Sequence, residues 1–192
     1  MRLFIAVDLD GAAKAELVAE QKRVAARAKG SAIRWVRAEH LHLTLVFLGE
    51  VAEALVPRVI EAIDAGVDHQ AFDAVFSGLG VFPERGAPRT LWVGAATGAT
   101  ELRALQHTLA ARLAPLGIAL DRRPFTPHLT LGRWKESRSA DRRRALEATE
   151  PPVVARSHVD HATLYHSRLT AEGPTYTELA RATLLGGAAA PD

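Results

Sequence analysis

The sequence predicts an α+β protein built of two similar lobes, and three observations support this prediction. The tetrapeptide HLTL occurs at residues 42–45 and again at residues 128–131. In each half of the chain an apolar strand, an amphipathic helix and a short strand-like segment precede it in the same order. The 192 residues, of which 48% are hydrophobic, are enough to bury a sizeable core. Strands and helices therefore mix within two similar units, as is typical of the α+β class.

The first unit begins with an apolar strand over residues 3–7, followed by a helix whose apolar side chains recur at helical spacing. A strand-like segment at 33–36 then leads into the first HLTL strand. The second unit repeats the order with a strand at 91–95, an amphipathic helix and a strand-like segment at 118–120. Residues 3 and 91 lie 88 positions apart and His42 and His128 lie 86 apart, so the register is kept within two residues. A period this long indicates an internal duplication and not a solenoid.

Further elements are expected after each HLTL strand. They are helices at about 52–65 and 139–148, and strands near 72–82, 152–166 and 175–185. Pro57 falls in the first turn of the earlier helix, where proline is tolerated. We expect residues 1–185 to form a single two-lobed domain, and residues 186–192, which show no pattern, to form a flexible tail.

Composition excludes several classes of protein. No apolar run approaches 18 residues, which argues against a membrane span. Asp8 and Asp10 interrupt the apolar run at the N-terminus too early for a signal peptide, so we interpret this run as a strand. Cysteine is absent, so neither disulfides nor cysteine-ligated metal contribute. These features are compatible with the cytoplasm, which is the expected location, and we expect a monomer.

The basic residues are strongly biased towards arginine, with 20 Arg and 4 Lys. Codon usage in a GC-rich genome explains such a bias without any function. Phosphate binding is the alternative, because the planar guanidinium matches phosphate oxygens. Position favours the second explanation for one group that lies within nine residues of His42 or His128, namely Arg34, Arg37, Arg122, Arg123 and Arg133.

The repeated HLTL segment places a histidine and a threonine on one face of a strand. Alternate side chains of a strand face the same side, so His42 projects with Thr44 and His128 with Thr130. Two such strands facing one cleft would present two imidazoles and two hydroxyls. One imidazole can accept a proton while the other donates one, and the hydroxyls can donate to phosphate oxygens. This chemistry requires no carboxylate, thiol or metal.

Two other interpretations of these histidines compete with this one. A single H-x-T-L strand is more often a half-exposed pair without chemistry, but two copies in matched register favour a site. His40 shares the face of His42 on an extended strand, and with His128 the two could supply three zinc ligands. The duplication gives His40 no counterpart, since position 126 is threonine. We therefore predict no metal.

Several segments, in order along nearly the whole chain, resemble a known family. They are RLFIAVDL, IRWVRAEHLHLTLVFLGEV, GLGVFPERGAPRTLWVG, RRPFTPHLTLGRW and LYHSRLTAEGPTYTEL. With both extended motifs present, the chain resembles the 2H phosphoesterase superfamily. Within it, the chain is most similar to the RNA 2′,3′-cyclic phosphodiesterases, also called 2′-5′ RNA ligases.

The resemblance implies a role for individual residues. His42 would be the general acid and His128 the general base, and Thr44 and Thr130 would bind the phosphate. Phe47 falls where the family has an aromatic residue near the nucleobase, and Arg133 where it has a basic residue at the phosphate.

The last two assignments leave alternatives open. Strict alternation along a strand turns Phe47 towards the core with Leu43 and Leu45, so core packing is an equal alternative. Arg133 also changes face relative to His128 on a straight strand, unless a bulge or turn at Gly132 redirects it.

The resemblance further implies a fold and an activity. Each lobe would be an antiparallel sheet with helices on its outer face, and the lobes would enclose a central catalytic groove. The enzyme would be a hydrolase that converts RNA or nucleoside 2′,3′-cyclic phosphates to 2′-phosphates without metal or cofactor, with 2′-5′ RNA ligation as the reverse reaction. Its partners would be RNA ends or nucleotides carrying the cyclic phosphate. A different cyclic phosphate substrate, or binding of RNA ends without catalysis, is the alternative.

Overall fold

The computed structural model describes residues 1–121, 123–146, 153–171 and 173–186. The strands are β1 (Arg2–Asp8), β2 (Ile33–Trp35), β3 (His42–Glu50), β4 (Val67–Gln70), β5 (Phe72–Phe82), β6 (Thr90–Thr97), β7 (His128–Trp134), β8 (Ala155–Val159), β9 (His161–Thr170) and β10 (Gly173–Leu185). The helices are α1 (Gly11–Arg27), α2 (Val56–Asp64), α3 (Ala99–Leu113) and α4 (Ser139–Leu146), with short 3-10 helices η1 (Ala38–His40), η2 (Glu53–Leu55) and η3 (Ala114–Leu116). Residues 187–192 of the predicted tail, and residues 147 and 148 of the predicted last helix, lie outside the described residues.

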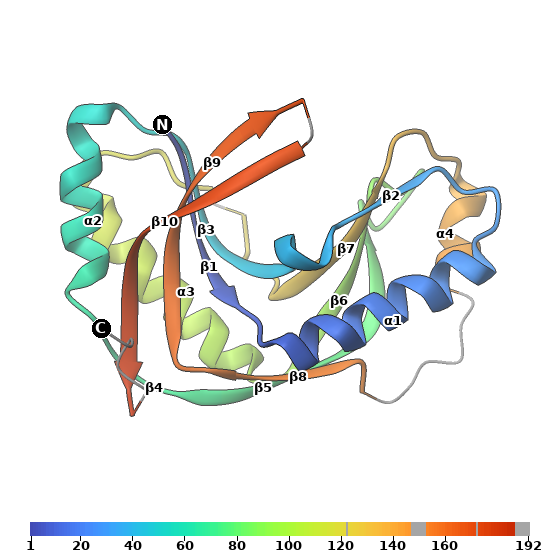
Figure 1. Ribbon diagram of the computed structural model, residues 1–192, viewed down its shortest axis with the longest axis horizontal. Helices are drawn as coiled ribbons and strands as arrows, with labels where there is room; N and C mark the ends of the chain where they lie inside the picture. The colour runs from blue at the N-terminus through green and yellow to red at the C-terminus, as the bar shows by residue number, and fades with distance from the viewer. Residues whose placement is uncertain (122, 147–152, 172, 187–192) are drawn as a thin grey trace.

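The described strands form two five-stranded sheets, each covered by helices (Figure 1). The first lobe consists of the sheet β3-β1-β9-β10-β4, on which α2 and α3 pack. The second lobe consists of the sheet β2-β7-β6-β5-β8, against which α1 and α4 pack. This confirms the predicted α+β class with two lobes. Among the described residues, no helix is both long enough and apolar enough to cross a membrane.

The two lobes are not the two halves of the chain. β1 lies in the first lobe, but α1, which follows it directly, packs on β7 and β8 of the second lobe. In the same way β6 belongs to the second lobe while α3 packs on β3 of the first. In each unit of the repeat, the first strand (β1 or β6) therefore belongs to one lobe, and the helix that follows it (α1 or α3) packs on the other. The C-terminal strands β9 and β10 complete the first sheet, so neither lobe could form from one half of the chain alone.

Local sequence accounts for most of the elements. Asp10 caps α1 by accepting a hydrogen bond from the Ala13 backbone at 2.7 Å, and the apolar face predicted for this helix is buried. Pro57 lies in the first turn of α2, as expected. The four leucines of α3 are fully buried, namely Leu102, Leu105, Leu109 and Leu113.

Two features differ from the expectation. Residues 118–120 form no strand; Ile118 and Leu120 are partly buried against the core, so their apolar character reflects packing and not sheet pairing. The short strand β4 was not predicted, and it pairs with β10 in parallel, whereas the other pairings in the described residues are antiparallel. β4 has only four residues, which are too few for an alternating hydrophobic pattern to be recognised in the sequence.

Candidate active site

The two HLTL segments begin β3 and β7, which lie side by side where the two lobes meet (Figure 1). The seven residues from His42 and from His128 have the same burial pattern. In both strands the histidine and threonine are half-buried, while the leucine between them, Leu43 or Leu129, is fully buried. Alternation along the strand has therefore placed each His-Thr pair on the face away from the core, as predicted.

Both strands carry a β-bulge three residues after the histidine. In β3 the partner of Ile5 is Val46 and the partner of Ala6 is Thr44, so Leu45 is the extra residue. In β7 the partners of Leu91 and Trp92 are Gly132 and Thr130, so Leu131 is the extra residue. A bulge interrupts the alternation of side chains beyond it. The two copies of the motif therefore share a backbone irregularity in addition to the HLTL sequence.

The bulges decide where Phe47 and Arg133 point. Each stands five residues after its histidine, and both are exposed on the side of the groove. Phe47 is 45% exposed, so the alternative that it packs in the core is wrong. Arg133 is redirected by the bulge at Leu131, directly before the glycine at which a bulge was expected. The two residues occupy equivalent positions of the repeat.

The bulge in β7 is supported from both sides. The buried side chain of Gln21 in α1 donates hydrogen bonds to the backbone oxygens of Leu131 and Val36, both at 2.8 Å. On the other side β2 pairs with β7, and its side chains lie so close that a Cβ atom at Gly132 would be 2.6 Å from Ile33 Cγ2. This position therefore requires glycine. Helix α1 and strand β2 together hold the part of β7 that carries the candidate site.

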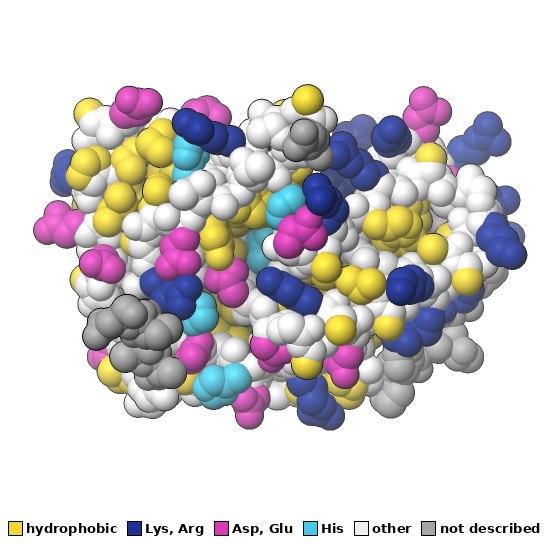
Figure 2. Space-filling view, in the orientation of Figure 1, with side chains coloured by type: hydrophobic (Ala, Val, Ile, Leu, Met, Phe, Trp, Pro, Cys, Tyr) yellow, Lys and Arg dark blue, Asp and Glu magenta, His cyan; other side chains and the backbone are white. Residues whose placement is uncertain are grey.

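A groove of about 1560 Å³ runs between the lobes. Thr44 and Phe47 line it from the first lobe, and His128 and Arg133 from the second. Its basic side chains are Arg85, Arg89, Arg123, Arg133 and Lys135. In Figure 2 histidines lie recessed between the lobes, and Lys and Arg side chains gather on the right, over the second lobe. The groove is suited to a phosphate-containing ligand.

The arginines that were predicted near the histidines differ in their surroundings. Arg133 donates a hydrogen bond to Thr90 Oγ1 at 3.0 Å and faces the groove. Arg123 also lines the groove, but it is paired with Asp121. Arg37 is paired with Glu39 at 2.7 Å, and neither it nor Arg34 is among the residues that line the groove. Arg122 lies outside the described residues.

His128 is oriented by the backbone. Its Nδ1 lies 2.7 Å from the carbonyl oxygen of Thr126, which can only accept, so Nδ1 carries the proton and Nε2 remains free for a ligand. Burial lowers the pKa of His128, the hydrogen bond to Thr126 raises it, and the charge of Arg133 lowers it further. Because the net direction is downward, the neutral form of His128 that can accept a proton is favoured.

His42 lies in a second cavity of about 400 Å³, which it shares with Asp8, Tyr165 and Tyr176. Its ring stacks on Phe4 with centroids 5.0 Å apart. Its Nε2 lies 3.1 Å from Thr44 Oγ1, which lines the large groove, so the two cavities meet at this pair.

The ionisation of His42 results from opposing effects. Burial lowers its pKa to about 4, although a hydrogen bond to the backbone of His40 and the charge of Asp8 both raise it. The nearby charges of His40 and Lys14 lower it further. The free protein therefore holds His42 mostly neutral at pH 7, and the anionic charge of a bound phosphate would favour its protonation.

The remaining predicted residues are placed as follows. Thr130 is half-buried on the face of β7 that carries His128, but it is not among the residues that line either cavity. His40 lies in the 3-10 helix η1 and not on the strand of His42, which corrects the expectation that the two share a strand face. Across the described ranges, no three His, Cys, Asp or Glu side chains come together in a way that could hold a metal ion.

Sequence reasoning missed the residues that surround His42. Asp8 closes the first strand, and in the sequence it only argues against a signal peptide. Tyr165 and Tyr176 belong to the late segment of the resemblance, but no role was assigned to them. Tyr176 lies edge-on to His42, with centroids 5.5 Å apart. The signal available in the sequence was weak, because these residues come from three strands that are distant along the chain.

Comparison with known proteins agrees with this geometry. The family model of the 2′-5′ RNA ligase superfamily matches residues 12–171. A relative from Archaeoglobus fulgidus, named RNA 2′,3′-cyclic phosphodiesterase, is 35% identical over 179 residues, which cover 93% of this chain and 98% of the relative. A Thermus thermophilus protein of known structure has a TM-score of 0.80 at 32% identity, covering 97% of this chain and 99% of its own.

A second solved structure, E. coli LigT in complex with 3′-AMP, has a TM-score of 0.76 at 28% identity, covering 96% of this chain and 98% of its own. The family match spans most of the chain, including both HxT strands, and the curated relative is similar over almost its full length. The chain therefore belongs to the 2′-5′ RNA ligase superfamily.

Proposed function

We propose that this protein hydrolyses the 2′,3′-cyclic phosphate of RNA ends or nucleosides to a 2′-phosphate. The observation that carries the proposal is the pair of HxT strands, β3 and β7, which lie against each other where the lobes meet. Thr44 and His128 line the groove, and His42 contacts Thr44 from the adjoining cavity. The name of the Archaeoglobus relative and the 3′-AMP bound to LigT support the same class of substrate.

His128 is suited to be the general base. Its neutral form is favoured, and its free Nε2 can accept a proton from water. The water oxygen then attacks phosphorus and the bond between phosphorus and O3′ breaks. O3′ takes a proton from His42, which is the general acid. The products are a 2′-phosphate and a free 3′-hydroxyl, and the two histidines have exchanged their protonation states.

The charge that develops on the phosphate oxygens needs donors that are already in position. Thr44 offers its hydroxyl beside His42 Nε2, and Thr130 occupies the equivalent position beside His128. The Arg133 guanidinium, near the other end of β7, is held by Thr90 and faces the groove. Together they would hold the phosphate between the two imidazoles.

The remaining parts of the proposal rest on this chemistry. No step requires a Lewis acid, so we propose that the reaction is independent of metal. The reverse reaction would join a 2′,3′-cyclic phosphate to a 5′-hydroxyl when both RNA ends are bound, with the roles of the two histidines exchanged. The monomeric state and the cytoplasmic location stay predictions of the sequence.

The direct test is incubation with 2′,3′-cyclic AMP, and with a short RNA ending in the cyclic phosphate, in buffer containing excess EDTA. Phosphorus NMR or chromatography against standards identifies the product isomer. We expect the 2′-phosphate from both substrates and an unchanged rate with the chelator. Formation of the 3′-phosphate alone, or complete loss of activity on chelation, would contradict the proposal. Binding of the RNA end without turnover would favour a non-catalytic binder.

Phe47 provides a separate prediction about the nucleobase. Its ring lies exposed beside the groove, with the Arg2 guanidinium carbon 5.2 Å from its centroid. Base–aromatic stacking contributes roughly 1–3 kcal/mol, and a partly exposed ring is expected at the lower end. We therefore expect Phe47→Ala to raise KM for 2′,3′-cyclic AMP about fivefold.

The control for Phe47 is Leu169→Ala, which removes an exposed apolar side chain of β9 that does not line the groove. Ribose 2′,3′-cyclic phosphate, which has no base, should be hydrolysed equally by Phe47→Ala and the unchanged protein. An equal loss on this substrate would show that Phe47 supports the groove and does not contact the base.

A further inference from the structure

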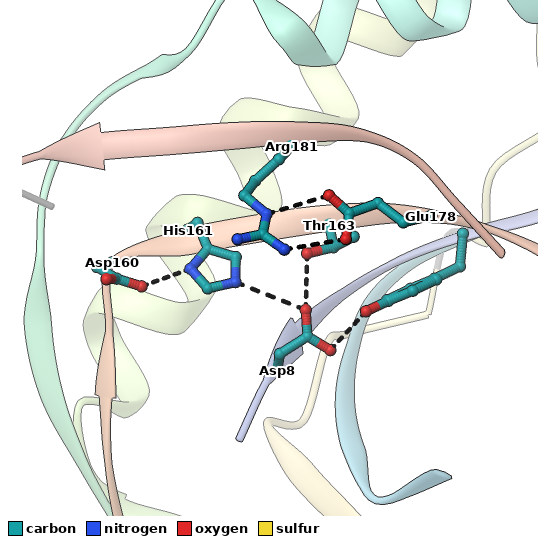
Figure 3. Close-up of polar contacts among 7 residues, drawn as sticks. Asp8, Asp160, His161, Thr163, Glu178 and Arg181 are labelled. Carbon is teal, nitrogen blue, oxygen red and sulfur yellow. Dashed lines mark hydrogen bonds and ion pairs between the residues drawn. The ribbon is translucent and has the colours of Figure 1, made fainter. Parts of the chain in front are cut away.

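A polar network in the first lobe has Asp8 at its centre (Figure 3). Thr163 Oγ1 donates to one carboxylate oxygen of Asp8 at 2.7 Å, and the Tyr165 hydroxyl donates to the other at 2.8 Å. His161 Nε2 lies 3.6 Å from the same carboxylate. The donors come from β9, the neighbour of β1 in the sheet, so the fold itself holds the carboxylate of Asp8 in one orientation.

Asp8 faces His42 directly. The two are partners in the β1–β3 register, so their side chains share a face, with Cβ atoms of such a pair about 4.5–5.5 Å apart. Both line the same small cavity. The repeat breaks its symmetry at this point, because the partner of His128 in the β6–β7 register is Gly94. One histidine of the repeated motif therefore faces a carboxylate, and the other faces no side chain at that position.

Asp8 is ionised over the working pH range. Burial raises its pKa, but the hydrogen bonds from His161, Thr163 and Tyr165 outweigh burial and lower the pKa to about 2. The neighbouring cations have carboxylates of their own: His161 is paired with Asp160, and Arg181 with Glu178. His161 also interacts with Asp8, and this contact raises the pKa of His161, so the Asp8 carboxylate lies between His161 on its own sheet and His42 on the side of the cavity.

The other charges facing His42 act mainly in the opposite direction. His40 and Lys14 disfavour a second positive charge, and Glu39 lines the cavity but is paired with Arg37. The hydroxyls of Tyr165 and Tyr176 are neutral, since burial raises the pKa of both. Among these groups Asp8 is the anion that the fold holds against His42.

We propose that Asp8 is a positioning residue for His42, and that its fixed carboxylate stabilises the imidazolium form of His42 that donates the proton once the phosphate is bound. The assignment rests on the proposed hydrolysis of a cyclic phosphate. It also explains how two copies of one motif acquire opposite roles. Asp8 lies against His42 and favours the imidazolium, whereas Arg133 lies near His128 and favours the neutral ring.

The test is Asp8→Asn, which keeps the size of the side chain and removes its charge. An opposite charge at this range typically shifts a pKa by about one unit or more. His42 is the proposed acid, so a lower pKa leaves less of it protonated. We expect kcat/KM on 2′,3′-cyclic AMP to fall about tenfold above pH 6, one limb of the pH profile to move about one unit lower, and KM to change little. NMR titration should place the His42 ring protons at a lower pKa.

Three variants make the result specific. Asp73→Asn is the matched control, because Asp73 is paired with His158 at 2.7 Å on the surface of the second lobe. It should leave the pH profile unchanged. Asp8→Glu restores the charge and should recover most of the rate above pH 6. If Asp8→Asn does not fold, Tyr165→Phe removes one neutral donor and leaves Asp8 ionised with its charge less neutralised, so the same limb should move in the opposite direction, to higher pH.

An unchanged pH profile in folded Asp8→Asn would overturn the inference. A fall in KM with a rise in kcat/KM would do so as well, since it would mean that Asp8 only repels the anionic substrate. These outcomes presuppose a wild-type protein that hydrolyses the cyclic phosphate. An inactive wild-type protein would instead remove the proposed function.

Discussion

Replacement of either His42 or His128 by alanine is expected to slow hydrolysis of a 2′,3′-cyclic phosphate by about 10²–10⁴-fold, the usual contribution of a positioned acid or base. Each ring sits at the start of its HLTL strand, and Nε2 of His128 is free while Nε2 of His42 contacts Thr44. Because one ring takes a proton and the other gives one, the two act as a unit. The rate loss in the double variant should therefore be far smaller than the product of the two single losses.

The pH dependence should reflect the same pair. The acid must be protonated and the base neutral, and burial lowers the pKa of both histidines, that of His42 to about 4. Activity should accordingly rise as pH falls from 8, and it should decline at acid pH when the base becomes protonated. The limbs of the bell-shaped profile belong to the pair and not to single residues.

Initial rates of the unchanged protein and of the three variants, measured from pH 4 to pH 9, test this prediction. His107→Ala is the control, since His107 is exposed on α3 and does not line either cavity. Near-normal activity in either single variant, or a profile with only one limb, would mean that the symmetry of the two motifs is inherited without a function.

Replacement of Thr44 or Thr130 by valine is expected to weaken transition-state binding by roughly 1–3 kcal/mol, which is the scale of a hydrogen bond to a charged group. This corresponds to a loss of about 5-fold to 150-fold in kcat/KM. Valine has nearly the shape of threonine, and both sites are half-buried on strands, so the fold should survive. The loss is expected mainly in kcat, because the phosphate charge is greatest in the transition state.

Thr177→Val is the matched control, because Thr177 is an exposed threonine of β10 that does not line the groove. Thermal unfolding should confirm that all three variants are folded. The two site threonines also differ in a way that the kinetics can detect. Thr44 lines the groove, whereas Thr130 lines neither cavity, so unchanged kinetics in Thr130→Val would assign Thr130 a structural role.

The outline of the fold and the centre of the site could be predicted from the sequence because they depend on local patterns. Alternation of His42, Leu43 and Thr44 along one strand determines which side chains are buried, and the second copy follows the same rule. The leucines of α3 likewise marked a helix that packs on one face. Hydrophobic periodicity shows which face of a helix or strand is buried, and both of these patterns reflect burial against the core.

Periodicity could not predict the bulges. Leu45 and Leu131 are ordinary strand residues in composition, yet each is the extra residue of its ladder. Whether a strand carries a bulge depends on its hydrogen-bonded partner, which the local sequence does not contain. The bulge turned Phe47 towards the groove, against simple alternation, and it redirected Arg133 to the same side.

The exchange of elements between lobes and the surroundings of His42 were decided only by the tertiary structure. α1 follows β1 in the sequence but packs on the opposite lobe, because each sheet takes strands from both halves of the chain. Asp8 reaches His42 across the β1–β3 ladder, and its hydrogen bonds come from Thr163 and Tyr165, about 155 residues away. The sequence by itself singled out the two histidines that we propose as acid and base. The charges placed around them, which differ between otherwise equivalent histidines, follow from strand pairing over long distances along the chain.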